Sequence, residues 1–222
     1  MACPEGGARS LYSLDMGGEP PGGPSETNRV EFFSDGVFAI AVTLLVLELA
    51  IPGTRGAFRD DLLNEWPSYV AYLAAFGTIG VLWMAHHTTF LRIRRVDTGL
   101  LWRNLVLLLS TSLFPFPTAV IASAYRIGDA TDQAAAVVLY AVVGMLSGAA
   151  WLVFFAYLRS QPALLEADAD IDAFWLQGPL LTIVGFGLAG LIGWLVSPAA
   201  GLAIFLIFPL FYVLRVRRVT QG

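Results

Sequence analysis

The sequence contains little charge. Only 14% of its 222 residues are Asp, Glu, Lys or Arg, about half the fraction of roughly 25% found in soluble domains. It has no lysine, so all 13 basic residues are arginines. Hydrophobic residues make up 57% of the chain, and a single soluble core of this length could not remove so much apolar surface from water. We therefore predict a protein that lies partly in lipid, and we do not expect a soluble enzyme.

Cysteine and catalytic motifs are also scarce. The one cysteine, Cys3, excludes a disulfide framework and a cysteine-built metal site. The sequence pairs no nucleophile with a base and has no phosphate-binding loop, so we expect neither enzymatic activity nor a cofactor. Its arginines fall in predicted loops rather than on one basic face, a distribution that gives no indication of nucleic-acid binding.

Long apolar runs account for most of the chain. The first is expected to run as a helix from about Val30 to about Ile51, with Asn28 as its N-cap and Glu31 completing a capping-box-like start. Further apolar blocks lie near residues 67–91, 99–123, 134–158, 174–196 and 199–214. Since a spanning helix needs about 20 apolar residues, the pattern predicts an all-α polytopic membrane protein with six transmembrane helices.

The ends of the chain differ from this apolar middle. Residues 1–28 are rich in glycine and proline and lack a continuous apolar run, so we expect a disordered tail rather than a signal peptide. Residues 29–214 are predicted to form the membrane domain, and residues 215–222 a basic tail. With the N-terminus inside, ten arginines face the cytoplasm and three face outward, which by the positive-inside rule puts both termini in the cytoplasm.

Several polar side chains fall inside the predicted spans near their cytoplasmic ends. Asp35 lies about 9 Å into the first helix from Arg29 at 1.5 Å per residue, and His86 lies equally far into the antiparallel second helix. Ionisable groups inside a span are costly and therefore informative. We expect one interhelical layer, with His87 as a further candidate beside its main members: Ser34, Asp35, His86 and Asn104.

Three interpretations of this layer are open from the residues alone. Its side chains can join the helices by hydrogen bonds, since polar groups in lipid persist only with partners. They can instead form a proton relay or a pH sensor, because histidine titrates near neutral pH. A metal site on Asp35 and His86 would need a third protein ligand from elsewhere.

The first helix also has an aliphatic side. At about 100° per residue, Ile40, Leu44 and Leu47 share one side with Thr43 beside them, whereas Asp35 lies about 140° from Ile40. Periodicity alone would predict that these residues face lipid or pack against another helix.

Three motifs in the first half of the chain resemble those of the transmembrane protein 175 family of potassium channels. The first is R-V-E-F-F-S-D at residues 29–35, which fits the family pattern R-x-x-x-F-S-D. The second is W-M-A-H at residues 83–86 with Phe90 after it, and the third is N-L at 104–105 followed by F-P-F at 114–116. No second F-S-D follows, so the chain is similar to prokaryotic members that carry a single repeat.

This resemblance implies a potassium-selective cation channel of the plasma membrane, a homotetramer whose first helices line the pore. Ile40 would form the main constriction, with Leu44 and Leu47 further outward and Thr43 as a nearby polar position. The network that supports the pore helices would comprise Arg29, Ser34, Asp35, Trp83, His86 and Asn104. The partners implied are potassium ions, the lipid bilayer and further copies of the chain, and no resident metal.

The residues also limit how such a channel could select ions. The sequence has no T-V-G-Y-G, and no proline breaks its first helix, so a filter of backbone carbonyls is not available there. Selectivity would come from a hydrophobic constriction, and we expect it to be modest. The alternative function is a proton-coupled secondary transporter that uses Asp35 and His86 as a relay.

Small residues and prolines predict close contacts and bends. Glycines spaced for close helix approach occupy two of the apolar blocks: Gly144, Gly148, Gly187, Gly190 and Gly193. Pro115 and Pro117 are predicted to kink the third helix.

Overall fold

The computed structural model describes residues 26–49, 58–167 and 173–219, and of residues 173–174 and 211–219 only the backbone. Most of the predicted N-terminal tail, residues 1–25, lies outside these ranges. Within them the regular structure is helical, apart from one isolated bridge between Ile93 and Leu165. The prediction of an all-α protein is confirmed.

The helices follow one another along the chain with short connections. In order they are α1 (Glu26–Leu44), the 3-10 helix η1 (Leu45–Glu48), α2 (Phe58–Asn64), α3 (Trp66–Phe90), α4 (Thr98–Ser112), α5 (Pro115–Ile127), α6 (Ala130–Ser160), the 3-10 helix η2 (Pro162–Leu164), α7 (Ala173–Leu195) and α8 (Pro198–Val219).

Five helical stretches in the described part of the chain are long and apolar enough to cross a membrane. They are α1 with η1, α3, α4 with α5, α6, and residues Trp175–Leu195 of α7. The apolar stretch Pro198–Leu210 of α8 is shorter, although its helix continues to Val219, past the predicted domain boundary at residue 214.

One predicted boundary is wrong, and one short helix was not predicted. α1 already includes Glu26, so Asn28 lies in its first turn and cannot be the residue that caps it. The short helix α2, in the connection before α3, has no counterpart among the predicted blocks, because it is too short to produce a readable apolar period.

Pro115 divides the third apolar block into two helices. α4 ends at Ser112, and α5 begins at Pro115, where the missing N–H of proline interrupts no intrahelical bond. In the segment between the two helices, the Phe114 N–H donates to the Thr111 carbonyl at 3.2 Å. The predicted kink is therefore a short break between helices that remain in one membrane-length stretch.

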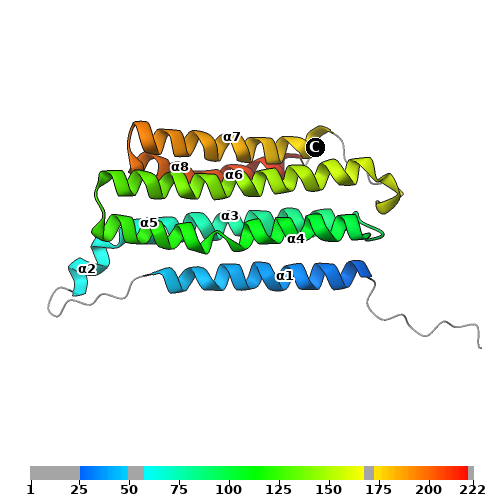
Figure 1. Ribbon diagram of the computed structural model, residues 1–222, viewed down its shortest axis with the longest axis horizontal. Coiled ribbons are helices and arrows are strands. Elements are labelled where there is room, and N and C mark those ends of the chain that lie inside the picture. Colours follow the sequence, from blue (N-terminus) through cyan, green and yellow to red (C-terminus); the bar gives the residue numbers. More distant parts are fainter. Residues whose placement is uncertain (1–25, 50–57, 168–172, 220–222) are drawn as a thin grey trace, which may run out of the picture.

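Most of the core lies away from α1. Figure 1 shows the long helices alongside one another, with α1 at one edge, α3, α4 and α5 in the middle, and α6, α7 and α8 on the far side. Large aromatic side chains around α6 are fully buried, among them Tyr140, Phe154, Phe186 and Phe205. Only 22% of the most apolar stretch of α1 and η1 is buried, against 56% for α6.

Glycines allow α6 and α7 to approach closely, as the sequence predicts. A Cβ atom on Gly144 of α6 would overlap the Phe186 ring of α7, and one on Gly193 of α7 would overlap Val137 of α6. Small residues at these positions therefore permit the packing of the two helices.

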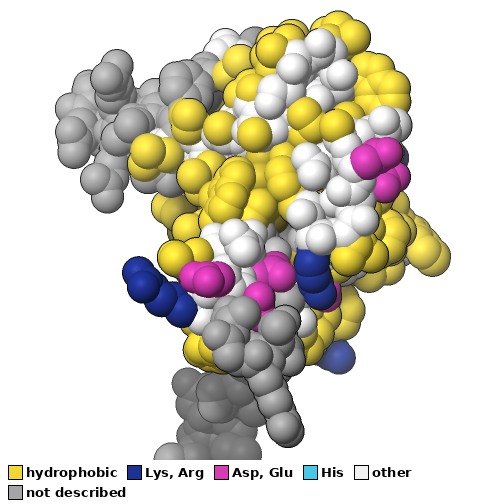
Figure 2. Space-filling view, turned by 90° about the vertical axis from the view of Figure 1, so that its left-hand side faces the viewer, with side chains coloured by type: hydrophobic (Ala, Val, Ile, Leu, Met, Phe, Trp, Pro, Cys, Tyr) yellow, Lys and Arg dark blue, Asp and Glu magenta, His cyan; other side chains and the backbone are white. Residues whose placement is uncertain are grey.

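The end of the bundle that carries α2 has a mixed surface. Figure 2 shows broad hydrophobic areas there, interrupted by a few acidic and basic side chains. The Nε atom of Arg126, at the end of α5, pairs with an Oε atom of Glu65, just before α3, at 3.3 Å.

Candidate functional site

Ser34, His86 and Asn104 form a buried hydrogen-bonded chain between α1, α3 and α4. Their exposed fractions are 0%, 0% and 2%. The Asn104 side-chain amide donates to the Ser34 hydroxyl at 2.9 Å, and the Ser34 hydroxyl donates to the Val30 carbonyl at 2.8 Å. His86 Nε2 lies 3.0 Å from Asn104 Oδ1, and because an amide oxygen can only accept, Nε2 carries the hydrogen.

Aromatic rings surround His86 on the other sides. The Phe90 ring stacks on it with centroids 4.2 Å apart, and Phe38 of α1 meets it edge-on at 5.3 Å. This packing fixes the imidazole and links the face of α1 that carries Ser34 to α3. Three of the predicted network residues are thus brought together.

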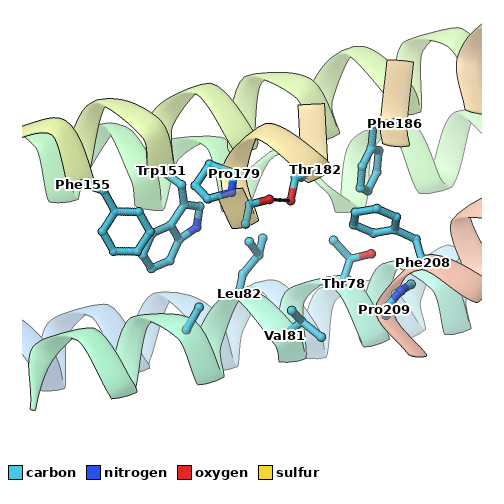
Figure 3. Close-up of a pocket in the computed structure, with 12 residues that line it drawn as sticks. Thr78, Val81, Leu82, Trp151, Phe155, Pro179, Thr182, Phe186, Phe208 and Pro209 are labelled. Atoms are coloured by element: carbon cyan, nitrogen blue, oxygen red, sulfur yellow. Dashed lines mark hydrogen bonds between the residues drawn. The ribbon is translucent and has the colours of Figure 1, made fainter. Parts of the chain in front are cut away.

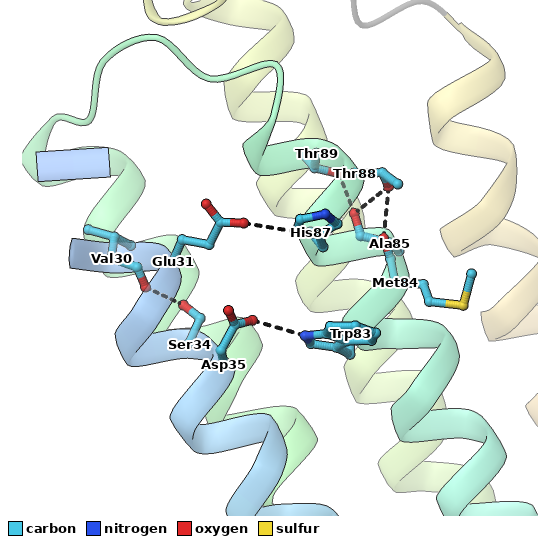
Figure 4. Close-up of polar contacts among 10 residues, drawn as sticks. All are labelled: Val30, Glu31, Ser34, Asp35, Trp83, Met84, Ala85, His87, Thr88 and Thr89. Carbon is cyan, nitrogen blue, oxygen red and sulfur yellow. Dashed lines mark hydrogen bonds and ion pairs between the residues drawn. The ribbon is translucent and has the colours of Figure 1, made fainter. Parts of the chain in front are cut away.

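Asp35 belongs to a separate group on a more exposed side of the same helices (Figure 4). The Trp83 indole N–H donates to Asp35 Oδ1 at 2.9 Å, and His87 Nδ1 lies 2.9 Å from Glu31 Oε1. The Trp83 and His87 rings stack with centroids 6.1 Å apart. The predicted single layer is therefore wrong: successive residues of α1 point about 100° apart, so Ser34 and Asp35 reach different partners.

Glu31 is the network residue that sequence reasoning missed. Its signal is spacing, since Glu31 precedes Asp35 by one turn of α1 and Trp83 precedes His87 by one turn of α3. Two antiparallel helices with such pairs can form two parallel bridges. His87, which matches no family motif, is held by the second of these bridges.

Arg29 is not part of either group. Its side chain is exposed, and among the described residues no hydrogen bond or ion pair to it is present. Arg29 is therefore not joined to the network within one protomer, and its role in the network stays a prediction.

The relay and metal interpretations find little support in this geometry. Asp35 bonds to Trp83, whereas His86 bonds to Asn104, so no direct bond joins the two proposed relay groups. Across the described ranges, no cluster of three or more His, Cys, Asp or Glu side chains could hold a metal ion.

The aliphatic side of α1 points away from the rest of the protomer. Ile40, Leu44 and Leu47 have exposed fractions of 61%, 42% and 73%. Thr43 is exposed as well, and its hydroxyl donates to the Ile40 carbonyl at 2.9 Å. The opposite side of the helix carries the buried residues Ser34, Phe38 and Ala41.

The first helix, predicted to run to about Ile51, ends earlier as an α-helix, and Ile51 itself lies outside the described residues. α1 ends at Leu44, and Leu47 lies in the 3-10 helix η1. Because a 3-10 helix turns about 120° per residue, the direction of Leu47 does not follow from the α-helical period that predicts Ile40 and Leu44.

The connection between α3 and α4 is fixed at its end by Asp97. Its carboxylate accepts hydrogen bonds from the Tyr157 hydroxyl of α6 at 2.7 Å and from the Leu100 N–H at 2.7 Å. These bonds, that of Tyr157 first, lower the pKa of the Asp97 carboxyl. The Arg103 guanidinium lies over the Tyr157 ring, 3.8 Å from its centroid, so α4 and α6 are joined by polar contacts at this end.

Comparison with known proteins identifies relatives over most of the chain. Residues 29–115 match the family described as endosomal/lysosomal potassium channel TMEM175. A potassium channel of Streptomyces collinus is 43% identical over 151 residues, which cover 67% of this chain and 72% of that protein. A potassium channel of Chamaesiphon minutus is 38% identical over 181 residues, which cover 77% of this chain and 88% of that protein.

A solved structure extends the similarity to the fold. The crystal structure of a lysosomal potassium-selective channel TMEM175 homolog from Chamaesiphon minutus aligns with 86% of this chain and 97% of its own, with a TM-score of 0.72 and 32% identity. The resemblance inferred from the three motifs is confirmed, and it extends beyond the half of the chain in which those motifs lie.

Proposed function

This chain belongs to the TMEM175 family of potassium channels, and we propose on that basis that it conducts potassium ions through a pore lined by α1. The relatives that are named potassium channels, together with the fold shared with a potassium-selective channel, support this activity. An ion channel catalyses no chemical reaction, which agrees with the lack of catalytic motifs in the sequence.

The observation that carries the proposal is the outward direction of Ile40, Leu44 and Leu47. Large aliphatic side chains that are exposed on one protomer can face lipid or other copies of the chain, and the family resemblance favours the second arrangement for these three. In a ring of protomers, the same residues of each copy would converge on the axis and form a hydrophobic constriction at Ile40. Such a constriction strips or reshapes the hydration of an ion, so we expect modest selectivity for potassium.

The buried side of α1 would hold this constriction in place. The Ser34–Asn104–His86 chain and the Asp35–Trp83 bond attach α1 to α3 and α4. We assign these residues to support of the pore helix rather than to ion binding. Thr43, whose hydroxyl is engaged with the Ile40 carbonyl, would add a polar position next to the constriction.

The assembly that follows is a closed ring of identical copies. One protomer supplies one α1, whereas a pore needs several lining helices, and a homo-oligomer with cyclic symmetry is the simple solution. The family resemblance favours a homotetramer. We further propose six spans, with α8 as the sixth, both termini in the cytoplasm, and a location in the plasma membrane.

Purified protein in planar bilayers tests the function. We expect discrete unitary currents that prefer potassium to sodium, since an alternating-access carrier cannot produce them. Ile40→Asn is expected to change conductance and the preference for potassium. Leu73→Asn, on an exposed part of α3, provides the matched control and is expected to leave both unchanged. Unaltered currents in Ile40→Asn would contradict the pore assignment, and saturable flux coupled to a pH gradient would favour the transporter.

A further inference from the structure

Two hollows of different chemistry lie in the protomer. One is a pocket of about 40 Å³ between α3, α6, α7 and α8 (Figure 3), and none of the side chains that line it is charged. The other is a wider surface groove of about 340 Å³ between α4 and α6, which we call the α4–α6 groove. One charged side chain, that of Arg103, is part of its lining. Large apolar side chains form much of the rest, among them Val106, Leu109, Leu146 and Val153.

The α4–α6 groove has the length of half a bilayer. Along α4 it extends from Arg103 to Leu113, which is about 15 Å at 1.5 Å per residue. The hydrocarbon core of a bilayer is about 30 Å thick, so one leaflet contributes about 15 Å. The small residues Ala149 and Ala150 of α6 also line the groove and leave room between the two helices. The groove therefore matches an acyl chain in one leaflet.

Apart from Arg103, the lining offers no side-chain group for a polar ligand. Ser110 is the other polar residue of the lining, and its hydroxyl donates to the Leu107 carbonyl at 2.7 Å. The aliphatic walls are open to the surroundings, since Leu109 of α4 is 61% exposed and Val153 of α6 is 53% exposed. Such a surface favours hydrocarbon over a polar solute.

Arg103 has a positive charge without a paired carboxylate. Of its five N–H donors, one on Nη1 bonds to the Gly99 carbonyl at 2.8 Å, whereas the buried Nε atom has no partner among the described residues. Asp97 is an acidic neighbour, but its carboxylate bonds to the Tyr157 hydroxyl. No ion pair to Arg103 is present in the described part of the chain. The guanidinium, held over the Tyr157 ring, therefore lacks a counter-charge.

The neighbours of Arg103 are typical of the level of lipid headgroups. Trp102 is 66% exposed and shares a side of α4 with Val106, which follows one turn later. Tryptophan is enriched at the membrane–water interface, where its ring lies among the headgroups. The connection from α3 to α4 adds the exposed arginines Arg94 and Arg95, which attract anionic lipids. Arg103 thus lies where the phosphate of a lipid is expected when its acyl chain fills the groove.

We propose that the α4–α6 groove binds one acidic phospholipid. The acyl chain lies between α4 and α6, and the phosphate accepts hydrogen bonds from the Arg103 guanidinium. A second copy of the chain would have to bring a carboxylate to this depth, whereas a phospholipid carries its phosphate at the end of its acyl chains. The proposal does not depend on which ion the protein conducts.

Thermal unfolding of the detergent-purified protein with added lipid tests the role of Arg103. Phosphatidylglycerol is expected to raise the unfolding temperature more than phosphatidylcholine with the same acyl chains. In Arg103→Gln this difference between the two lipids is expected to fall to less than half. Because the difference is taken within each variant, a loss of stability caused by Arg103→Gln itself does not affect it. An undiminished difference in Arg103→Gln would overturn the proposal.

Arg159→Gln is the matched control. It removes an exposed arginine near the end of α6 that is not part of the groove lining, so the full difference between the two lipids is expected to remain. An equal fall in Arg159→Gln and Arg103→Gln would mean that the lipid responds to overall charge rather than to the groove, and would overturn the proposal.

Two further measurements identify the occupant. Ala149→Phe fills the groove but keeps Arg103, and it is expected to weaken the response to phosphatidylglycerol. Inorganic phosphate is expected to leave the unfolding temperature unchanged; a shift equal to that of the lipid would mean that a free anion is bound, which would overturn the proposal. If Ala149→Phe instead changes the oligomer size and leaves the lipid response intact, a second copy covers the groove and the proposal is wrong.

Discussion

The most apolar stretches of α1 with η1 and of α6 are nearly equal in mean hydropathy, but the two helices use their apolar residues differently. In α6, aromatic and small side chains are buried among α4, α5, α7 and α8 and hold the protomer together. In α1, polar side chains make the buried contacts with α3 and α4, and Ile40 and Leu47 are left exposed. Hydropathy alone therefore does not reveal which apolar residues form the core of the protomer and which stay exposed on its surface.

The largest expected difference between the two helices is the loss of stability when one apolar side chain of each is truncated. Phe154→Ala in α6 removes a fully buried ring and is expected to lower the free energy of unfolding by about 3–5 kcal/mol. Ile40→Ala in α1 is expected to cost less than about 1 kcal/mol in protomer stability, because its side chain is mostly exposed there. Thermal unfolding of the two purified variants measures the difference, and equal losses would contradict it.

Asn104→Ala tests whether polar contacts hold the buried side of α1. The change leaves His86 Nε2–H without an acceptor and Ser34 without a donor, so we expect a loss of about 2–3 kcal/mol. Asn64→Ala, on the exposed surface of α2, is the control and should stay within about 0.5 kcal/mol of the unchanged protein. A small effect of Asn104→Ala in chemical unfolding would show that packing alone holds α1.

The sequence predicts the helical class and the meeting of Ser34, His86 and Asn104 because both follow from simple counting. Apolar runs give the spans, and similar depth from the arginines at the ends of these spans places the three side chains at one level. Depth does not give the rotation of a helix about its axis, and for that reason Asp35 was expected beside His86 rather than beside Trp83. The Glu31–His87 bridge depends on the same rotation.

All three residues of the predicted aliphatic side are exposed, but they do not lie in one type of helix. Ile40 and Leu44 point outward, as expected from the α-helical period. Leu47 is exposed too, but it lies in η1, and a change of helix type is set by packing at the end of α1 rather than by a pattern that the sequence displays.

Asp97 gives a pH dependence at the end where α4 and α6 meet. Its pKa is lower in the folded protein than in the unfolded chain, so its contribution is present above the unfolded pKa and is lost as the pH falls through the folded pKa. We expect Asp97→Ala to cost about 1 kcal/mol at pH 7, as for other helix caps, and to weaken the loss of stability toward low pH. Unfolding temperatures from pH 7 to pH 3 check this, and parallel curves would contradict it.

The smallest expected effect concerns the exposed bond between α1 and α3. Trp83→Phe removes the hydrogen bond to Asp35 but keeps an aromatic ring, and because the site is partly exposed we expect a loss of about 0.5–1 kcal/mol. A loss as large as that of Asn104→Ala in the same unfolding assay would mean that the two polar groups of α1 are equally important for its attachment.

The accessibility of residue 40 from the ion path tests the central claim most directly. In a Cys3→Ser background, which leaves no other cysteine, Ile40→Cys and Ala39→Cys are compared while a thiol-reactive cation is applied to the conducting protein. Ala39 is exposed as well but points about 100° away from residue 40. We predict that the reagent blocks the current of Ile40→Cys and spares that of Ala39→Cys. An unchanged current in Ile40→Cys, with the thiol shown to be modified, would contradict the assignment of α1 as the pore helix.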